Sequence, residues 1–407
     1  MLKFTCTGRI LLTAATAFSC FAGSSLAQNQ EKGQAFKFSL RTGIEYTDNN
    51  ESDPDAIAEG NTSFSLSPRV DVFLNGSRTI ADIYYQPTLL YRTDASTIQN
   101  DEDFYHLLGI SLDHKLTPKT KAVLREQFIM TDDPGIGEGN SVRRDQTHYI
   151  NRFSPGILYA VSPSTKLDAR VFYNIKRFDE STVADESDED RAGIVVKVFH
   201  KLDKTTGLSG SVGYRSADFE SKIRNIERGS EIITAYVGAD HSFSPNFRLG
   251  VDGGVDLIEH EDDALDSDTE PYAKLSATIS PATSLRVTGS IAHGAREADV
   301  YPFSTQTYTE FIGRADLEAN EALDLGVKAT VRQSEYDIDD RPPSAAPTAN
   351  FAATYGDETT TVFSGYADWK LPSGAKIRFT QVYEDVDSDV EITFTKNTSK
   401  VELVVDF

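Results

Sequence analysis

Apolar and polar side chains alternate, one residue at a time, along most of this 407-residue chain. The stretch 399–407 shows the pattern most clearly, because every second residue from 401 on is apolar: Val401, Leu403, Val405 and Phe407. A period of two residues is typical of a β-strand with one apolar and one polar face. The same period recurs in stretch after stretch, so we predict an all-β protein.

The connections between these stretches alternate between short and long. The short ones carry turn signals such as Asn75-Gly76-Ser77. The long ones include residues 131–145, 179–190, 220–230, 259–270, 296–306 and 335–358. A β-solenoid would instead repeat at a fixed period, and a series of sandwich domains would show linkers between them.

This arrangement predicts a single antiparallel transmembrane β-barrel over residues 28–407. We expect 18 strands, short periplasmic turns, long acidic extracellular loops and both termini on the short-turn side. Sixteen strands is the alternative count, because Ile232 and Ile233 point to opposite faces and leave the phase of residues 231–243 ambiguous. A barrel of this size has room for an aqueous channel, unlike one of eight strands.

The first 27 residues have the pattern of a cleaved secretory signal peptide. Lys3 and Arg9 precede an apolar run over residues 10–23, and Ser25-Leu26-Ala27 fits a small-x-small cleavage site. The run is shorter than the roughly 20 residues that a membrane-spanning helix needs. A lipoprotein leader cleaved before Cys20 is the alternative.

The charge balance is strongly acidic, with 63 Asp and Glu against 40 Lys and Arg. Without a basic patch, nucleic acid is excluded as a partner. The densest acidic runs are 185–190 and 259–263, in long connections, and predict a solvated acidic crown bridged by divalent ions to lipopolysaccharide. Neither run has the Asp-x-Asp-x-Asp-Gly order of a calcium loop, so we predict no metal site and no cofactor.

The apolar row of each strand is expected to face lipid, because a charged side chain at the bilayer midplane costs about 2–4 kcal/mol. Aromatic residues gather near the ends of these rows, as in the interfacial girdles of membrane barrels. The girdle on the long-loop side is predicted from Tyr46, Phe64, Tyr91, Phe104, Phe128, Tyr149, Tyr214, Phe311, Phe363 and Tyr383, and the other from Phe36, Phe38, Tyr159, Trp369 and Phe407.

The polar rows carry basic residues on nearly every strand. The predicted pore-lining residues are Arg41, Arg69, Arg125, Arg152, Arg170, Lys197, Arg215, Arg286, Arg314 and Arg332. Aspartates share this surface, so Arg–Asp pairs that brace the wall of the lumen are one interpretation. A positively biased bore that attracts anions is the other, and the two are compatible.

No catalytic residues are predicted. The sequence contains neither Gly-x-Ser-x-Gly nor His-Glu-x-x-His. Five histidines fall at strand ends on apolar rows, where an interfacial position accounts for them: His106, His114, His200, His241 and His293. The chain is therefore not expected to be an enzyme.

Two resemblances refine the prediction. The closing strand, with Val401, Leu403, Val405 and Phe407, resembles the C-terminal strand by which the barrel-assembly machinery recognises outer-membrane barrels of Gram-negative bacteria. The opening stretch 36–49, with Gly-x-x-Tyr-x-Asp-Asn at its end, resembles the first hairpin of the β-barrel porin type 2 family. That resemblance implies a role in exopolysaccharide export or surface assembly, and transfers no functional residues.

The sequence leaves two functions open. The first is a porin-like channel for anionic solutes or exopolysaccharide, and the second is a non-conducting barrel that presents its acidic loops at the cell surface. The longest connection, 335–358, is predicted either to pack at the mouth or fold into the lumen and narrow it, or to remain a flexible outer loop. Outer-membrane lipid is an expected partner in both cases, and the oligomeric state stays open.

Overall fold

The computed structural model describes residues 35–94, 100–132, 146–219, 228–298, 300–337 and 356–407. The predicted leader 1–27 and most of the connection 335–358 lie outside these residues. The described chain contains one short helix, α2 (Ser181–Ser187), and eighteen strands. The strands are β1 (Phe36–Thr47), β2 (Asn61–Asn75), β3 (Thr79–Arg92), β4 (Glu102–Lys115), β5 (Thr120–Thr131), β6 (His148–Ala160), β7 (Thr165–Phe178), β8 (Glu189–Lys201), β9 (Thr206–Phe219), β10 (Ser230–Ser244), β11 (Phe247–His260), β12 (Asp268–Ala282), β13 (Leu285–Glu297), β14 (Thr305–Asn320), β15 (Leu323–Tyr336), β16 (Gly356–Lys370), β17 (Lys376–Ser388) and β18 (Phe394–Asp406).

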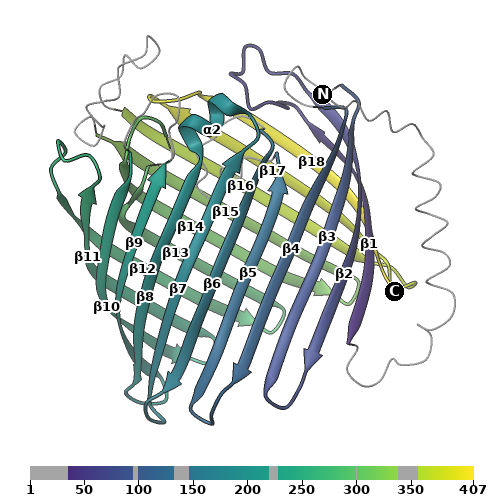
Figure 1. Ribbon diagram of the computed structural model, residues 1–407. Coiled ribbons are helices and arrows are strands. Elements are labelled where there is room, and N and C mark those ends of the chain that lie inside the picture. The colour runs from purple at the N-terminus through teal and green to yellow at the C-terminus, as the bar shows by residue number, and fades with distance from the viewer. Residues whose placement is uncertain (1–34, 95–99, 133–145, 220–227, 299, 338–355) are drawn as a thin grey trace.

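Each strand pairs with its neighbours in sequence, and β1 also pairs with β18, so the sheet closes into an 18-stranded antiparallel barrel (Figure 1). The prediction of 18 strands with alternating short and long connections is confirmed, and the alternative of 16 is wrong. A closed ladder satisfies the backbone of every strand from within the sheet, which is what a lipid environment requires.

The terminal strand joins the two ends of the sheet. Ser39 pairs with Asp406, and the backbone N–H of Phe407 donates to the carbonyl of Phe38 at 2.8 Å. The rings of Phe38 and Phe407 lie 5.4 Å apart. The stretch with the clearest alternation in the sequence is thus the one that closes the barrel.

Side chains fix the tight turns locally. In the turn between β8 and β9, a carboxylate oxygen of Asp203 accepts hydrogen bonds from the backbone N–H groups of Thr205 and Thr206, at 2.6 and 2.8 Å. These bonds favour the ionised carboxyl and lower the pKa of Asp203 to about 2. In the turn between β16 and β17, Gly374 has φ of +86°, a conformation that favours glycine.

A contact across the barrel identifies the inner face of the wall. Arg215 on β9 reaches Glu297 on β13, four strands away in the sheet, at 2.7 Å. Only the interior permits such a contact. Residues directly opposite each other in antiparallel strands share a face, so the pairing of neighbouring strands identifies the inner-face residues of every strand. The opposite face exposes apolar side chains such as Val237, which is 72% exposed.

The end of one hairpin leaves the wall and folds into the interior. Pairing between β12 and β13 ends at Ala273 opposite His293, whereas β13 stays paired with β14 up to Glu297 opposite Thr305. We call residues 294–298 and 300–306 the inward hairpin. Residues 296–306 connect β13 and β14 as predicted, but they are almost wholly buried and do not form an outer loop.

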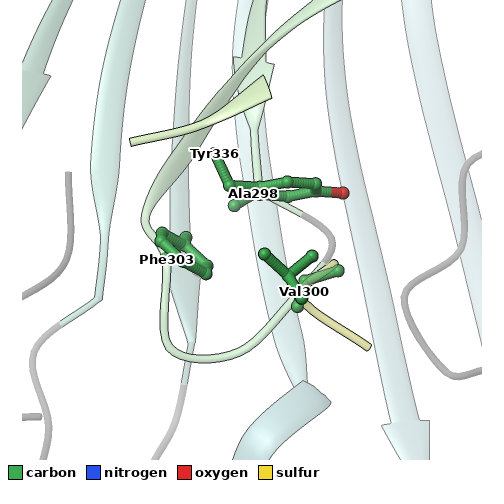
Figure 2. Packing of buried hydrophobic residues seen from close by; sticks show 5 residues of the cluster. Ala298, Val300, Phe303 and Tyr336 are labelled. Atoms are coloured by element: carbon green, nitrogen blue, oxygen red, sulfur yellow. The ribbon is translucent and has the colours of Figure 1, made fainter. Parts of the chain in front are cut away.

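The inward hairpin contributes to two apolar clusters inside the barrel. Ala295 packs against Ile232 and Ile258, which project from the inner face of β10 and β11 and are nearly inaccessible. This contact explains the ambiguous phase of residues 231–243, because Ile232 packs inside while Ile233 faces outward. A second cluster gathers Ala298, Val300 and Phe303 beside Tyr336, as Figure 2 shows, together with Val390.

The acidic run 185–190 does not form a solvated crown. Helix α2 and the start of β8 occupy it, and Asp185, Ser187 and Glu189 are buried. Asp190 pairs with Arg177 at 2.5 Å. Asp188 lies beside the same arginine at 3.8 Å, and Glu189 pairs with Arg191, so this run forms a folded part of the barrel mouth.

Candidate functional site

The lumen is the candidate functional site, and the inward hairpin narrows its long-loop end. The carboxylate of Glu297 is 2% exposed and lies between two guanidinium groups, 2.7 Å from Arg215 and 3.6 Å from Arg191. Arg215 also donates to the backbone carbonyl of Ala295 at 2.7 Å. The hairpin is thus attached to β8 and β9 by a buried, charge-assisted network.

Further hydrogen bonds attach the inward hairpin to β10 and β11. The backbone N–H of Ala295 donates to Asp256 on β11 at 3.0 Å. The other oxygen of Asp256 accepts from the hydroxyl of Thr234 on β10 at 2.5 Å. Asp256 is nearly inaccessible, so these bonds satisfy a carboxylate that burial would otherwise destabilise.

Arg228 links the hairpin to the connection that contains α2. Its guanidinium lies 3.9 Å from the ring centroid of Phe219 and 5.7 Å from that of Tyr301. It donates to the carbonyl of Glu186 at 2.6 Å and to that of Ala298 at 3.5 Å. Only 3% of Arg228 is exposed, so hydrogen bonding and stacking both act in a water-poor environment.

All ten predicted pore-lining residues lie on the inner face by the cross-strand registers. Three of them form ion pairs with an aspartate two residues away on the same strand: Arg69 with Asp71 at 2.6 Å, Arg170 with Asp168 at 2.9 Å and Arg314 with Asp316 at 2.7 Å. Two more pair with the adjacent strand, Arg125 with Asp113 at 2.8 Å and Arg332 with Glu310 at 2.7 Å. Braced Arg–carboxylate pairs therefore account for much of the basic row.

The other predicted residues have different neighbours. Arg152 donates to the side chain of Gln127 at 3.3 Å, and Lys197 lies 5.0 Å from the ring of Phe199. Arg286 stands opposite Asp316 in the register of β13 and β14. Arg215 is the residue that binds the inward hairpin, so its role is partly structural.

Arg41 differs from the paired residues. Its Nε is buried and has no hydrogen-bond partner among the described residues. It lines a cavity of about 460 Å³ near the short-turn end of the lumen, at the seam where β1 meets β18 and β2. The charged side chains around the cavity are Lys37, Arg41, Arg69, Lys370, Lys376, Asp71 and Asp406. Four of the five cations are paired, Lys37 with Asp406, Arg69 with Asp71, Lys370 with Asp324 and Lys376 with Asp368, which sets Arg41 apart from them.

Sequence reasoning missed the contacts that hold the inward hairpin, which are made by Glu297, by Arg228 and by Asp256 with the Ala295 N–H. The signal that could have found the contact is the pair Ile232 and Ile258, two apolar residues on rows that should line water. Inner-face isoleucines require a partner inside the barrel.

Two features are absent from the described part of the chain. No group of three or more His, Cys, Asp or Glu residues there is placed to hold a metal ion. In the same residues, no helix has the length and apolar character needed to cross a membrane.

No family model matches the sequence, and no curated protein matches it. Among solved structures, OccAB4 of Acinetobacter baumannii is similar in fold, with a TM-score of 0.51 and 10% identity over 93% of this chain and 100% of that chain. The outer membrane proteins OprD and OpdK of Pseudomonas aeruginosa have TM-scores of 0.48, with 12% and 11% identity over 93% and 91% of this chain and 96% and 99% of their own. At these identities the likeness concerns the fold alone, and OccAB4 supports the barrel seen here.

Proposed function

We propose that the protein is a porin-like channel in the outer membrane of a Gram-negative bacterium, and that it passes small solutes with a preference for anions. The observation that carries the proposal is a closed barrel of 18 strands with an apolar outer face and a charged inner face. An apolar outer face is stable only in lipid, and charged walls hold water in the lumen.

The anion preference is supported by the cavity at the short-turn end. Arg69 is already paired with Asp71, but Arg41 has no carboxylate partner among the described residues and faces the same cavity. A cation that the wall does not neutralise is available to a passing carboxylate or phosphate. Rings and clusters of such residues favour anion passage.

A planar bilayer measurement tests this proposal. With a salt gradient across the membrane, the wild-type channel should give a reversal potential on the anion-selective side, and Arg41→Glu should move it toward cations. Lys204→Glu, in a turn outside the lumen, makes the same charge change and serves as the control. A wild-type reversal potential on the cation side would contradict the anion preference.

A non-conducting barrel that acts through its outer loops is the second candidate. The inward hairpin favours it, because Val300, Phe303 and Tyr336 form a buried apolar cluster in the mouth. Absence of single-channel events from correctly folded protein would select this function over the first.

The resemblance of residues 36–49 to the β-barrel porin type 2 family extends the proposal to acidic exopolysaccharide as a transported solute. The motif has a structural role: Asn49 donates to the carbonyls of Asp53 and Thr395, at 2.7 and 2.9 Å, and ties the first long connection to β18. Blockade of the current by an anionic oligosaccharide, and not by a neutral one of equal length, is the expected result.

A further inference from the structure

Three histidines on the outward face repeat one arrangement at the short-turn end of the barrel. The Nδ1 atoms of His114, His200 and His241 each lie 2.8–3.0 Å from a threonine hydroxyl. The partners are Thr79, Thr165 and Thr206, and each threonine precedes its histidine by 35 residues. In every case the threonine opens one strand and the histidine stands near the end of the next.

The three pairs stand at one level on the wall. Thr79 is directly opposite His114, Thr165 opposite His200, and Thr206 opposite His241 in the registers of β3 with β4, β7 with β8 and β9 with β10. Between the first two pairs, Thr120 stands opposite Tyr159 at the same place. The histidines thus occupy positions of the aromatic girdle.

An apolar residue follows each histidine two positions later. These residues are Leu116, Leu202 and Phe243, and all of them are more than half exposed. In the membrane they extend the apolar surface beyond the imidazole rings. The rings therefore stand at the boundary of hydrocarbon and headgroups, where bulk water is scarce.

The threonine bond leaves one ring nitrogen to be satisfied from outside the protein. When the hydroxyl donates to Nδ1, the neutral imidazole carries its proton on Nε2, which becomes a donor directed away from the pair. A donor without a partner at this depth is costly.

We propose that the three Thr–His pairs bind the phosphates of glycerophospholipids in the periplasmic leaflet and set the depth of the barrel in the membrane. The threonine holds the ring, and Nε2 donates to a phosphate oxygen. This inference rests on the membrane location in the proposed function, and is independent of what the lumen conducts.

The test is solid-state NMR of the protein with ¹⁵N-labelled histidine in vesicles of phosphatidylethanolamine and phosphatidylglycerol. Dipolar dephasing by ³¹P should reach Nε2 and leave Nδ1 much less affected. The triple variant His114→Phe, His200→Phe, His241→Phe should lose most of this dephasing; His293, which has the same contact with Thr309 at 2.9 Å, remains in it. Tyr159→Phe, which changes the same girdle without removing an imidazole, should keep it. Threonine-to-valine changes at Thr79, Thr165 and Thr206 should weaken it by releasing the rings.

Trp369 reports separately on the membrane location. It is the only tryptophan of the chain, is 61% exposed and occupies the same girdle on β16. Quenching of Trp369 by lipids brominated near the headgroup, without ³¹P dephasing of any Nε2, would overturn the phosphate proposal and leave the membrane location standing. No quenching by any brominated lipid would overturn both. Dephasing unchanged in the triple variant would also overturn the phosphate proposal.

Discussion

Replacing Glu297 by glutamine should loosen the inward hairpin. The side chain keeps its size and one acceptor oxygen, but loses the charge between Arg191 and Arg215. Removing one partner of a fully buried ion pair costs about 3–5 kcal/mol. The cost here is smaller, since Arg191 also pairs with Glu189 and both arginines are partly exposed.

We therefore expect Glu297→Gln to destabilise the folded-in position by about 2 kcal/mol, which changes the ratio of folded-in to released hairpin by a factor of about 30. The bonds from Arg215 to the Ala295 carbonyl and from the Ala295 N–H to Asp256 remain, so the hairpin should still fold in for most of the time.

Single-channel recording in a planar bilayer measures this change. Brief openings to a higher conductance should become roughly 30 times more frequent in Glu297→Gln than in the wild type, following the same ratio. Glu310→Gln is the matched control, because Glu310 pairs with Arg332 on the adjacent strand and does not cross the lumen. Equal opening frequencies in both variants, or no change in Glu297→Gln, would refute the idea that this ion pair holds the hairpin.

Three further predictions concern Phe407, Arg41 and the N-terminus of the mature protein. Deleting Phe407 should leave the precursor exported but poorly inserted, seen as loss of heat-modifiable mobility and of outer-membrane yield; normal yield would contradict its role in assembly. Reversing the charge of Arg41 should shift the reversal potential more than reversing Arg314, because Arg314 already pairs with Asp316 at 2.7 Å; an equal shift would show that pairing does not matter. N-terminal sequencing of the mature protein should begin near Gln28, and a start at Cys20 would favour the lipoprotein leader instead.

The strands of the barrel wall could be predicted because the signals for them lie close together in the sequence. Alternation assigns a face to each side chain, and turn residues such as Asn75-Gly76 mark where the chain reverses. Arg41 and Arg314 could be placed on the inner face by the same period. Which of them is neutralised could not be predicted in every case, since pairing depends on the register between strands.

The inward hairpin was not predictable from the period. Glu297 follows the outward row of β13, so its parity points to lipid, and nothing nearby in the sequence announces Arg215, 82 residues earlier. Its partners come together only after the sheet has closed. The prediction of a solvated crown at residues 185–190 was wrong for a related reason. Composition gives the charge of a run but not the cation that pairs with it, here Arg177.

Because the end of β13 leaves the wall, its outward row of side chains faces two different environments. Up to Ile291 and His293 the row faces outward, and beyond them Ala295 and Glu297 face the protein interior. Tolerance to substitution should reverse within these few positions. A carboxylate would be rejected at Ile291 and favoured at Glu297, whereas a leucine would be accepted at the first and disfavoured at the second. A fitness map of this row would therefore show, without any structure, where the strand leaves the membrane.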